Sequence, residues 1–124
     1  MIAIDTSSLI AFLGGEQGRD VEALDRALEL SQEVLPPVVL TEILSAPRLQ
    51  PRVAKLVREL PILETLPGFW ERAALTRSKI LERRLRARLA DTLISQSCLD
   101  HGAALVTRDR DFRHFVEHAG LDLV

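Results

Sequence analysis

Residues 1–9, MIAIDTSSL, are the stretch from which the rest of the chain can be interpreted. Ile2, Ala3 and Ile4 form a short apolar run of the kind that fills a parallel strand buried on both faces. The run ends on Asp5, and hydroxyl residues then lead into an apolar, helix-like segment. Because open α/β sheets bind ligands at the carboxyl ends of their strands, Asp5 is a candidate site residue. Capping of the following helix would explain the same residue.

The composition is that of an ordinary globular protein. The chain has 124 residues, of which 47% are hydrophobic and 27% charged, so it can bury a core without disulfides or metal staples. We therefore expect a single domain over residues 1–124. The formal charge of −2 argues against nonspecific coating of nucleic acid, although a local basic face remains possible.

The sequence also indicates a cytoplasmic protein. Its single cysteine, Cys98, rules out an intramolecular disulfide and fits a reducing compartment. Asp5 interrupts the apolar start and no basic segment precedes it, so we expect no signal peptide. No apolar run approaches the roughly 20 residues of a membrane span, and we expect no membrane partner.

Short apolar runs alternate with segments of helical periodicity along the whole chain. Strands are expected at residues 2–4, 34–35, 62–65, 103–107 and 121–124. Helices are expected at residues 9–13, 19–32, 38–45, 53–60, 69–86, 90–101 and 112–118. This alternation predicts an α/β fold with three layers, α/β/α, around a mostly parallel central sheet of four to five short strands.

Four acids are expected at one rim of this sheet. Asp5 and Asp109 follow apolar strands, whereas Glu42 and Asp91 lie in helices. Strand ends and helix N-termini meet at the same rim, and four carboxylates there need a counter-charge. Mg²⁺ or Mn²⁺ suits such oxygen ligands. Two simpler interpretations stay open, namely that Glu42 lies on a solvated helix face and that Asp91 only complements its helix dipole.

Basic residues gather between residues 77 and 88. They are nearly all arginines, with Glu82 as the one acid among them. Such a run is often a solvated helix face, but it could also form a surface that contacts phosphates.

The acidic positions, read with their neighbours, resemble a known family. Asp5-Thr6-Ser7 after the first strand, Glu42 within a helix, Asp91 in ADTLIS and LVTRDRDF at residues 105–112 are similar to PIN-domain ribonucleases. The closer resemblance is to the VapC-type toxins of type II toxin–antitoxin systems, and it extends over the whole chain.

The resemblance implies roles for individual residues. Asp5, Glu42, Asp91 and Asp109 would be catalytic and would bind the metal, and Asp111 would either join them through a water or cap the helix starting at Phe112. Hydroxyls that would orient the acids or a bound water belong to Thr6, Ser7 and Thr107. The candidate contacts to the RNA backbone are Arg83, Arg84, Arg86, Arg88 and Arg108.

The implied function is endonucleolytic hydrolysis of RNA by a water activated at a four-carboxylate Mg²⁺ or Mn²⁺ site. The resemblance also implies a cognate antitoxin protein and a homodimer. Receiver domains and haloacid-dehalogenase-type phosphatases have similar architecture. However, Thr6 and Ser7 stand where these folds need further acids, and no lysine follows Lys79. The remaining alternative is a catalytically inactive PIN-like module that binds RNA or protein.

Overall fold

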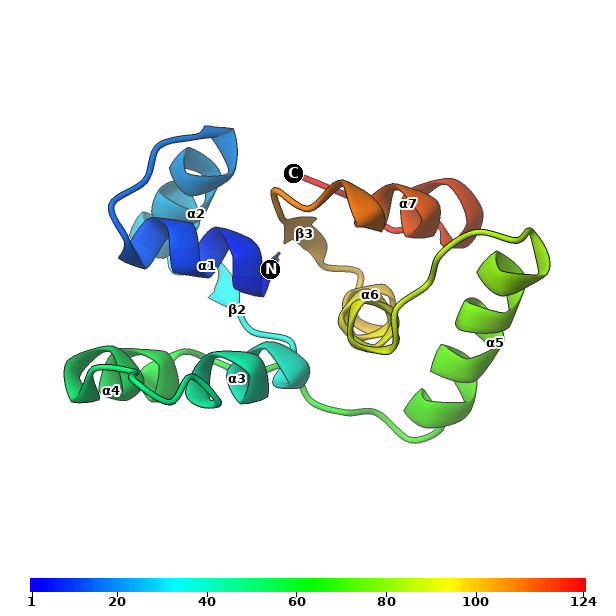
Figure 1. Cartoon of the computed structure of the whole chain (residues 1–124), viewed down its shortest axis with the longest axis horizontal. Helices are drawn as coiled ribbons and strands as arrows, with labels where there is room; N and C mark the ends of the chain where they lie inside the picture. The colour runs from blue at the N-terminus through cyan, green and yellow to red at the C-terminus, as the bar shows by residue number, and fades with distance from the viewer.

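The computed structural model describes all of residues 1–124 and contains three strands, seven α-helices and one 3₁₀ turn (Figure 1). The elements in chain order are β1 (Ile2–Ile4), α1 (Thr6–Leu13), α2 (Arg19–Glu29), β2 (Glu33–Val34), α3 (Pro37–Leu44), α4 (Pro51–Glu59), α5 (Phe69–Glu82), α6 (Leu89–His101), β3 (Ala104–Val106), η1 (Arg110–Phe112) and α7 (Arg113–Ala119). Strands and helices alternate as the sequence predicts for an α/β protein.

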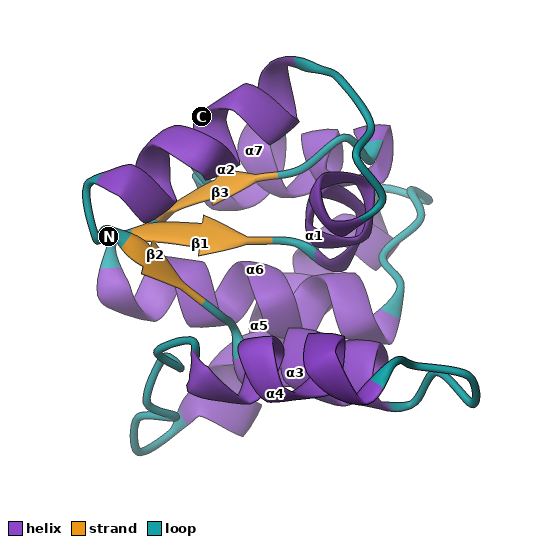
Figure 2. Ribbon diagram, turned by 90° about the vertical axis from the view of Figure 1, so that its left-hand side faces the viewer, coloured by secondary structure: helices purple, strands orange, loops and turns teal.

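The three strands form a parallel sheet in the order β2-β1-β3 (Figure 2). Successive residues of a strand point to opposite faces. Ala3 and Ile4 in the central strand are both fully buried, and so are Leu105 and Val106 in β3 to within 1%. Helices therefore cover both faces of the sheet, and the predicted α/β fold with a parallel sheet is confirmed.

The prediction of four to five strands was wrong, because the sheet has only three. The two outer segments are each reduced to one parallel bridge, between Leu35 and Ile62 and between Leu105 and Leu123. At the first edge, Pro36 follows Leu35 and has no N–H with which to extend a ladder. Pro37 then begins α3, so the chain leaves the sheet after a single pair.

Helix α6 runs through the middle of the molecule and packs against α5 on one side and α3 on the other (Figure 1). Six of its residues are buried, among them Ile94 and Cys98. Cys98 is fully buried in the hydrophobic core, and this burial raises the pKa of its thiol to about 12. Neither α6 nor any other helix combines the length and the apolar character needed to cross a bilayer.

The helix expected at residues 69–86 ends early, at Glu82. Arg84 adopts a positive φ of 59°, which takes the chain out of the helix. Ala87 is then buried with 4% exposure, and Arg77 Nε donates a 2.8 Å hydrogen bond to its carbonyl oxygen. The second half of the basic run is therefore a loop that leads into α6.

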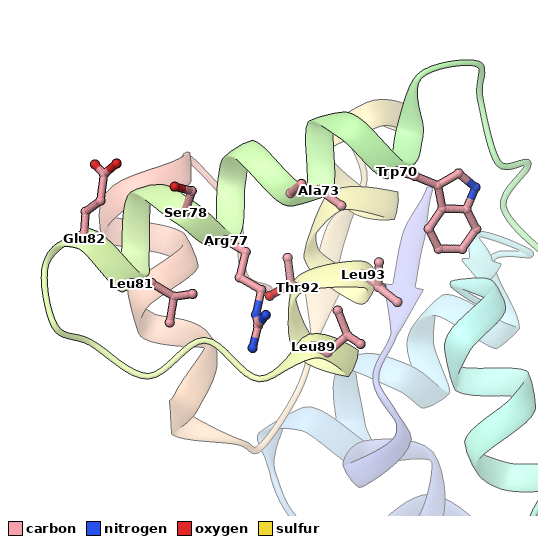
Figure 3. A pocket seen from close by; sticks show the side chains of 10 residues that line it. Trp70, Ala73, Arg77, Ser78, Leu81, Glu82, Leu89, Thr92 and Leu93 are labelled. Carbon is pink, nitrogen blue, oxygen red and sulfur yellow. The ribbon is translucent and has the colours of Figure 1, made fainter.

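The apolar side chains of α5 are divided between two environments. Ala73 and Ile80 are buried, but Trp70 is 64% exposed and Leu81 is 45% exposed. These two side chains border a surface groove of about 650 Å³ between α5 and α6, which Leu89 and other residues line from α6 (Figure 3). Trp70 therefore contributes to the surface of the protein and adds little to its core.

Candidate metal centre

Asp5 lies directly after β1, where the sequence places it. Its backbone N–H donates to the carbonyl of Val106 at the end of β3, and the residue is 4% exposed. It occupies the N-cap position of α1 but forms no capping hydrogen bond. Instead, its Oδ2 accepts hydrogen bonds of 2.7 Å from both Ser7 Oγ and Thr107 Oγ1. The carboxylate is thus oriented by two hydroxyls at the rim of the sheet.

Three other aspartates gather at this rim. Asp91 lies in the first turn of α6, Asp109 follows β3, and Asp111 lies in the η1 turn. One carboxylate oxygen from each lies within 4.8 Å of the other two, and all three residues are partly buried. The structure therefore brings together acids that are far apart in the sequence.

Asp91 shows the electrostatic cost of this arrangement. Its pKa is raised from 3.8 to about 6, first by burial and then by the negative charges of Asp109 and Asp5. Arg88 opposes the shift. Asp5 is thus close enough to act on the cluster, and the site has a deficit of positive charge that a divalent cation would remove.

Glu42 lies outside the three-aspartate cluster. It is exposed on α3, and its Oε1 accepts a 2.7 Å hydrogen bond from Thr6 Oγ1. Thr6 is the neighbour of Asp5, so Glu42 is linked to the rim through one side chain. The structure therefore places Glu42 on a solvated helix face that borders the site.

The capping role expected for Asp111 was wrong. The chain makes the η1 turn before α7, and Asp109 Oδ1 accepts the capping hydrogen bond, 2.9 Å long, from the backbone N–H of Asp111. The backbone N–H of Asp109 in turn donates to Thr107 Oγ1 at 3.0 Å. Because Asp109 caps the turn, the carboxylate of Asp111 remains directed into the acidic cluster.

The five candidate arginines fall into three groups. Arg86 Nη1 and Arg88 Nη2 each lie 3.9 Å from Asp111 Oδ2, at the border of the cluster. Arg83 and Arg84 are exposed at the end of α5. Arg108 instead directs its guanidinium to residues of the α1–α2 region.

Asp20, the main partner of Arg108, was not predicted from the sequence. The two residues are 88 positions apart, and Asp20 looks like an ordinary acid in the first turn of a helix. No local pattern connects them. The glycine at position 18 is the one feature in the sequence that could have drawn attention to this segment.

The donor set fits a hard divalent cation. The cluster offers only carboxylate oxygens, which Mg²⁺ and Mn²⁺ prefer, and no histidine or cysteine belongs to it. One oxygen from each residue lies within 4.8 Å of the other two, so a single ion could be held among them. Asp91 and Asp109, with Asp111, are the residues that would hold the ion, and Asp5 lies beside them.

The fold and this rim define an α/β protein with a carboxylate-lined site at the ends of its strands. The profile of the PIN domain matches residues 2–117. The chain therefore belongs to the PIN-domain family, as the resemblance in its sequence predicts. Among curated protein sequences, none matches the chain significantly.

Several solved structures share the fold. FitAcB from Neisseria gonorrhoeae is 20% identical and matches with a TM-score of 0.72, over 99% of this chain and 96% of that chain. VapBC2 from Rickettsia felis, bound to a DNA fragment from its promoter, is 18% identical with a TM-score of 0.74, over 100% and 98%. A toxin–antitoxin complex from Klebsiella pneumoniae is 21% identical with a TM-score of 0.65, over 90% of each chain.

Proposed function

We propose that this protein is a metal-dependent endoribonuclease and the toxin of a toxin–antitoxin pair. The observation that carries the proposal is the cluster of Asp91, Asp109 and Asp111 beside Asp5, at the rim where α/β proteins bind ligands. Membership of the PIN-domain family supports it, because the family resemblance implies a ribonuclease.

The residues divide the chemical work among them. A bound Mg²⁺ or Mn²⁺ would polarise a phosphoryl oxygen and supply a nucleophilic water at neutral pH. Asp91, Asp109 and Asp111 provide ligand oxygens, and Asp5, fixed by its two hydroxyl donors, presents a further carboxylate. Glu42 is one of the four acids that the family resemblance implies, and it would act from beside Asp5, to which Thr6 connects it.

The RNA backbone needs positive charge near these acids, which would otherwise repel it. Arg86 and Arg88 are the arginines best placed to provide it, since they lie at the border of the cluster and are more than half exposed. Arg83 and Arg84 extend the same basic surface along the chain. We expect these four side chains to contact phosphates without selecting a sequence.

An antitoxin would find an apolar groove next to the site. The groove, of about 700 Å³, lies between α1 and the α3–α4 segment. Ile10, Leu13, Ile43 and Val53 line it, and Glu42 stands at its edge. An amphipathic segment of an antitoxin could bury its apolar face here and reach the acids. The toxin–antitoxin complex from Klebsiella pneumoniae, which shares the fold, supports such a partner. We also propose that the protein forms a homodimer and acts in the cytoplasm.

The test is RNA cleavage by the purified protein without a partner. We would incubate it with total RNA and Mg²⁺ or Mn²⁺, beside the variants Asp5→Asn and Asp91→Asn and a chelator control. Asp25→Asn, on the exposed face of α2, is the matched control. Discrete cleavage that both site variants and the chelator abolish, and Asp25→Asn preserves, is expected. Cleavage that survives both site variants would contradict the carboxylate site. Absence of cleavage by folded protein, on all RNA classes, would favour the inactive binding module.

A further inference from the structure

Arg108 stands between two residues of the proposed site but directs its side chain away from it. It follows Thr107, which donates to Asp5, and precedes Asp109 in the acidic cluster. Its Nε and Nη2 donate to the two oxygens of Asp20 at 2.8 and 3.1 Å. Two weaker bonds reach Glu16 Oε1 at 3.3 Å and the carbonyl of Gln17 at 3.2 Å.

The start of α2 and the loop before it accommodate this ion pair. Asp20 is 10% exposed in its side chain and also accepts a 2.8 Å hydrogen bond from Ser8 Oγ on α1. Gly18 has a φ of 152°, and a Cβ there would lie 2.6 Å from Asp20 Oδ1 and 3.1 Å from Arg108 Nη2. Only glycine leaves room for the pair, so the α1–α2 region and Arg108 fit one another closely.

Contact of Arg108 with RNA would disrupt this arrangement. The guanidinium uses its Nε, Nη1 and Nη2 groups on protein acceptors, and its side chain is only 33% exposed. A phosphate would have to displace a bidentate carboxylate that already matches the geometry of the guanidinium. These contacts within the protein favour a role for Arg108 other than contact with the RNA backbone.

We propose that Arg108 is a positioning residue, whose ion pair with Asp20 fixes the segment at residues 107–111 and thereby the spacing of the acids. Other contacts also hold this segment, among them those of Asp111 with Arg86 and Arg88 at 3.9 Å, and Arg108 is the residue that joins it to α2. Thr107 bonds to Asp5, and the Arg108 N–H lies 3.4 Å from Ser7 Oγ. The guanidinium joins this strand end to α2 and to the loop that precedes it, so Asp109 is held at a constant position relative to Asp5. The consequence for metal binding rests on the proposed function, but the positioning itself does not.

The first measurement is hydrogen exchange of the metal-free protein. The amides of Asp109 and Asp111 donate within the segment, so their protection reports its order. In Arg108→Gln and Asp20→Asn, we expect both amides to exchange roughly tenfold faster than in the wild type. Unchanged protection of residues 107–111 in both variants would overturn the proposal, whether or not the protein is a nuclease.

The second measurement is Mn²⁺ binding by calorimetry without RNA, followed by cleavage kinetics. We expect both variants to bind Mn²⁺ roughly fivefold or more weakly and to lose kcat, with KM for RNA nearly unchanged. The double variant Arg108→Asp/Asp20→Arg should restore part of the affinity. If Arg108 contacts RNA instead, Arg108→Gln would raise KM alone and Asp20→Asn would free the arginine and lower KM.

A matched control separates positioning from general stability. Arg72 and Asp100 form the other bidentate pair of the chain, with bonds of 2.9 and 2.6 Å, and Asp100 lies at the opposite end of α6 from Asp91. Arg72→Gln should lower the melting temperature without changing Mn²⁺ affinity or the exchange of residues 107–111. Equal effects of Arg72→Gln and Arg108→Gln on these two readouts would contradict a specific role. A wild-type protein that binds no Mn²⁺ would contradict the proposed function alone.

Discussion

Thr107 and Asp5 join the ends of two neighbouring strands through a 2.7 Å hydrogen bond from Thr107 Oγ1 to Asp5 Oδ2. The same hydroxyl accepts from the backbone N–H of Asp109 at 3.0 Å, so it links one acid of the site to the segment that carries another. The Thr107 hydroxyl therefore connects the end of β1 to the loop after β3. Its loss should disturb the geometry of the site.

Thr107→Val removes this hydroxyl while keeping the shape of the side chain. Because Asp5 loses a donor and the Asp109 N–H loses its acceptor, we expect kcat to fall roughly tenfold and stability to fall by about 1–2 kcal/mol. Thr76→Val is the matched control, since the Thr76 hydroxyl donates to Gln96 Oε1 inside the protein. Denaturant unfolding should show a similar loss for both variants, and only Thr107→Val should lose activity. An equal loss of activity in both would contradict the role of Thr107.

Asp91→Asn should stabilise the metal-free protein at neutral pH. Burial and the charges of Asp109 and Asp5 raise the pKa of Asp91 from 3.8 to about 6. The folded state thus binds this proton more tightly than the unfolded state, so stability is present below pH 3.8 and is lost as pH rises through 6. At pH 7.5 the neutral amide should raise the free energy of unfolding by about 1–2 kcal/mol, after allowance for the partial solvation of residue 91.

The measurement is denaturant unfolding of metal-free Asp91→Asn and wild type at pH 7.5 and at pH 4. The variant's excess in free energy of unfolding over wild type should be largest at pH 7.5. It should shrink toward pH 4, where wild-type Asp91 is protonated. Asp25→Asn, on an exposed helix face, should leave stability nearly unchanged at both pH values. A variant less stable than wild type at pH 7.5 would show that the acids do not repel one another in the folded protein.

Asp20→Asn should have the opposite dependence on pH. The hydrogen bonds from Arg108 hold the pKa of Asp20 at about 2, below its usual 3.8. Its contribution is therefore present above pH 3.8 and is lost as pH falls toward 2. We expect the free energy of unfolding of the variant to be about 1–2 kcal/mol lower than that of wild type at pH 6, a value that allows for the partial solvation of Arg108. This difference should narrow toward pH 3. A loss that stays constant from pH 6 to pH 3 would exclude the ionised pair as its cause.

Local patterns predict much of the fold, and contacts between distant segments explain the rest. The apolar run at β1 and the glycine after α6 mark their elements to within about a residue, since burial and capping act locally. The outer strands were overestimated because pairing partners, and not β-propensity, decide whether Ile62 or Leu123 extends a ladder. Likewise, the early end of α5 depends on the burial of Ala87 in the tertiary structure.

The candidate site shows the same division. Strand ends alone suggest Asp5 and Asp109, because a parallel sheet collects its carboxyl ends at one rim. Whether Asp111 caps a helix or joins the site depends on the η1 turn, which no sequence pattern predicts. The ion pair of Arg108 with Asp20 spans 88 positions and is equally invisible in the sequence. Pairings of this kind are set by how α1, α2 and β3 pack, and only the structure reveals them.

Arg86→Gln/Arg88→Gln should weaken RNA binding. Both guanidiniums lie 3.9 Å from Asp111 and are more than half exposed, so they can turn toward a phosphate at small cost. Each phosphate contact with single-stranded RNA contributes about 0.7 to the slope of log affinity against log salt. We therefore expect KM to rise and the slope of log affinity against log salt to become shallower by about 1.4. Loss of Arg88 also removes a charge that opposes the raised pKa of Asp91, so this pKa should rise further. Arg26→Gln/Arg58→Gln, which removes the same charge from α2 and α4, should leave the slope unchanged. If both double variants reduce it equally, then overall charge, and not the loop beside the acids, attracts the RNA.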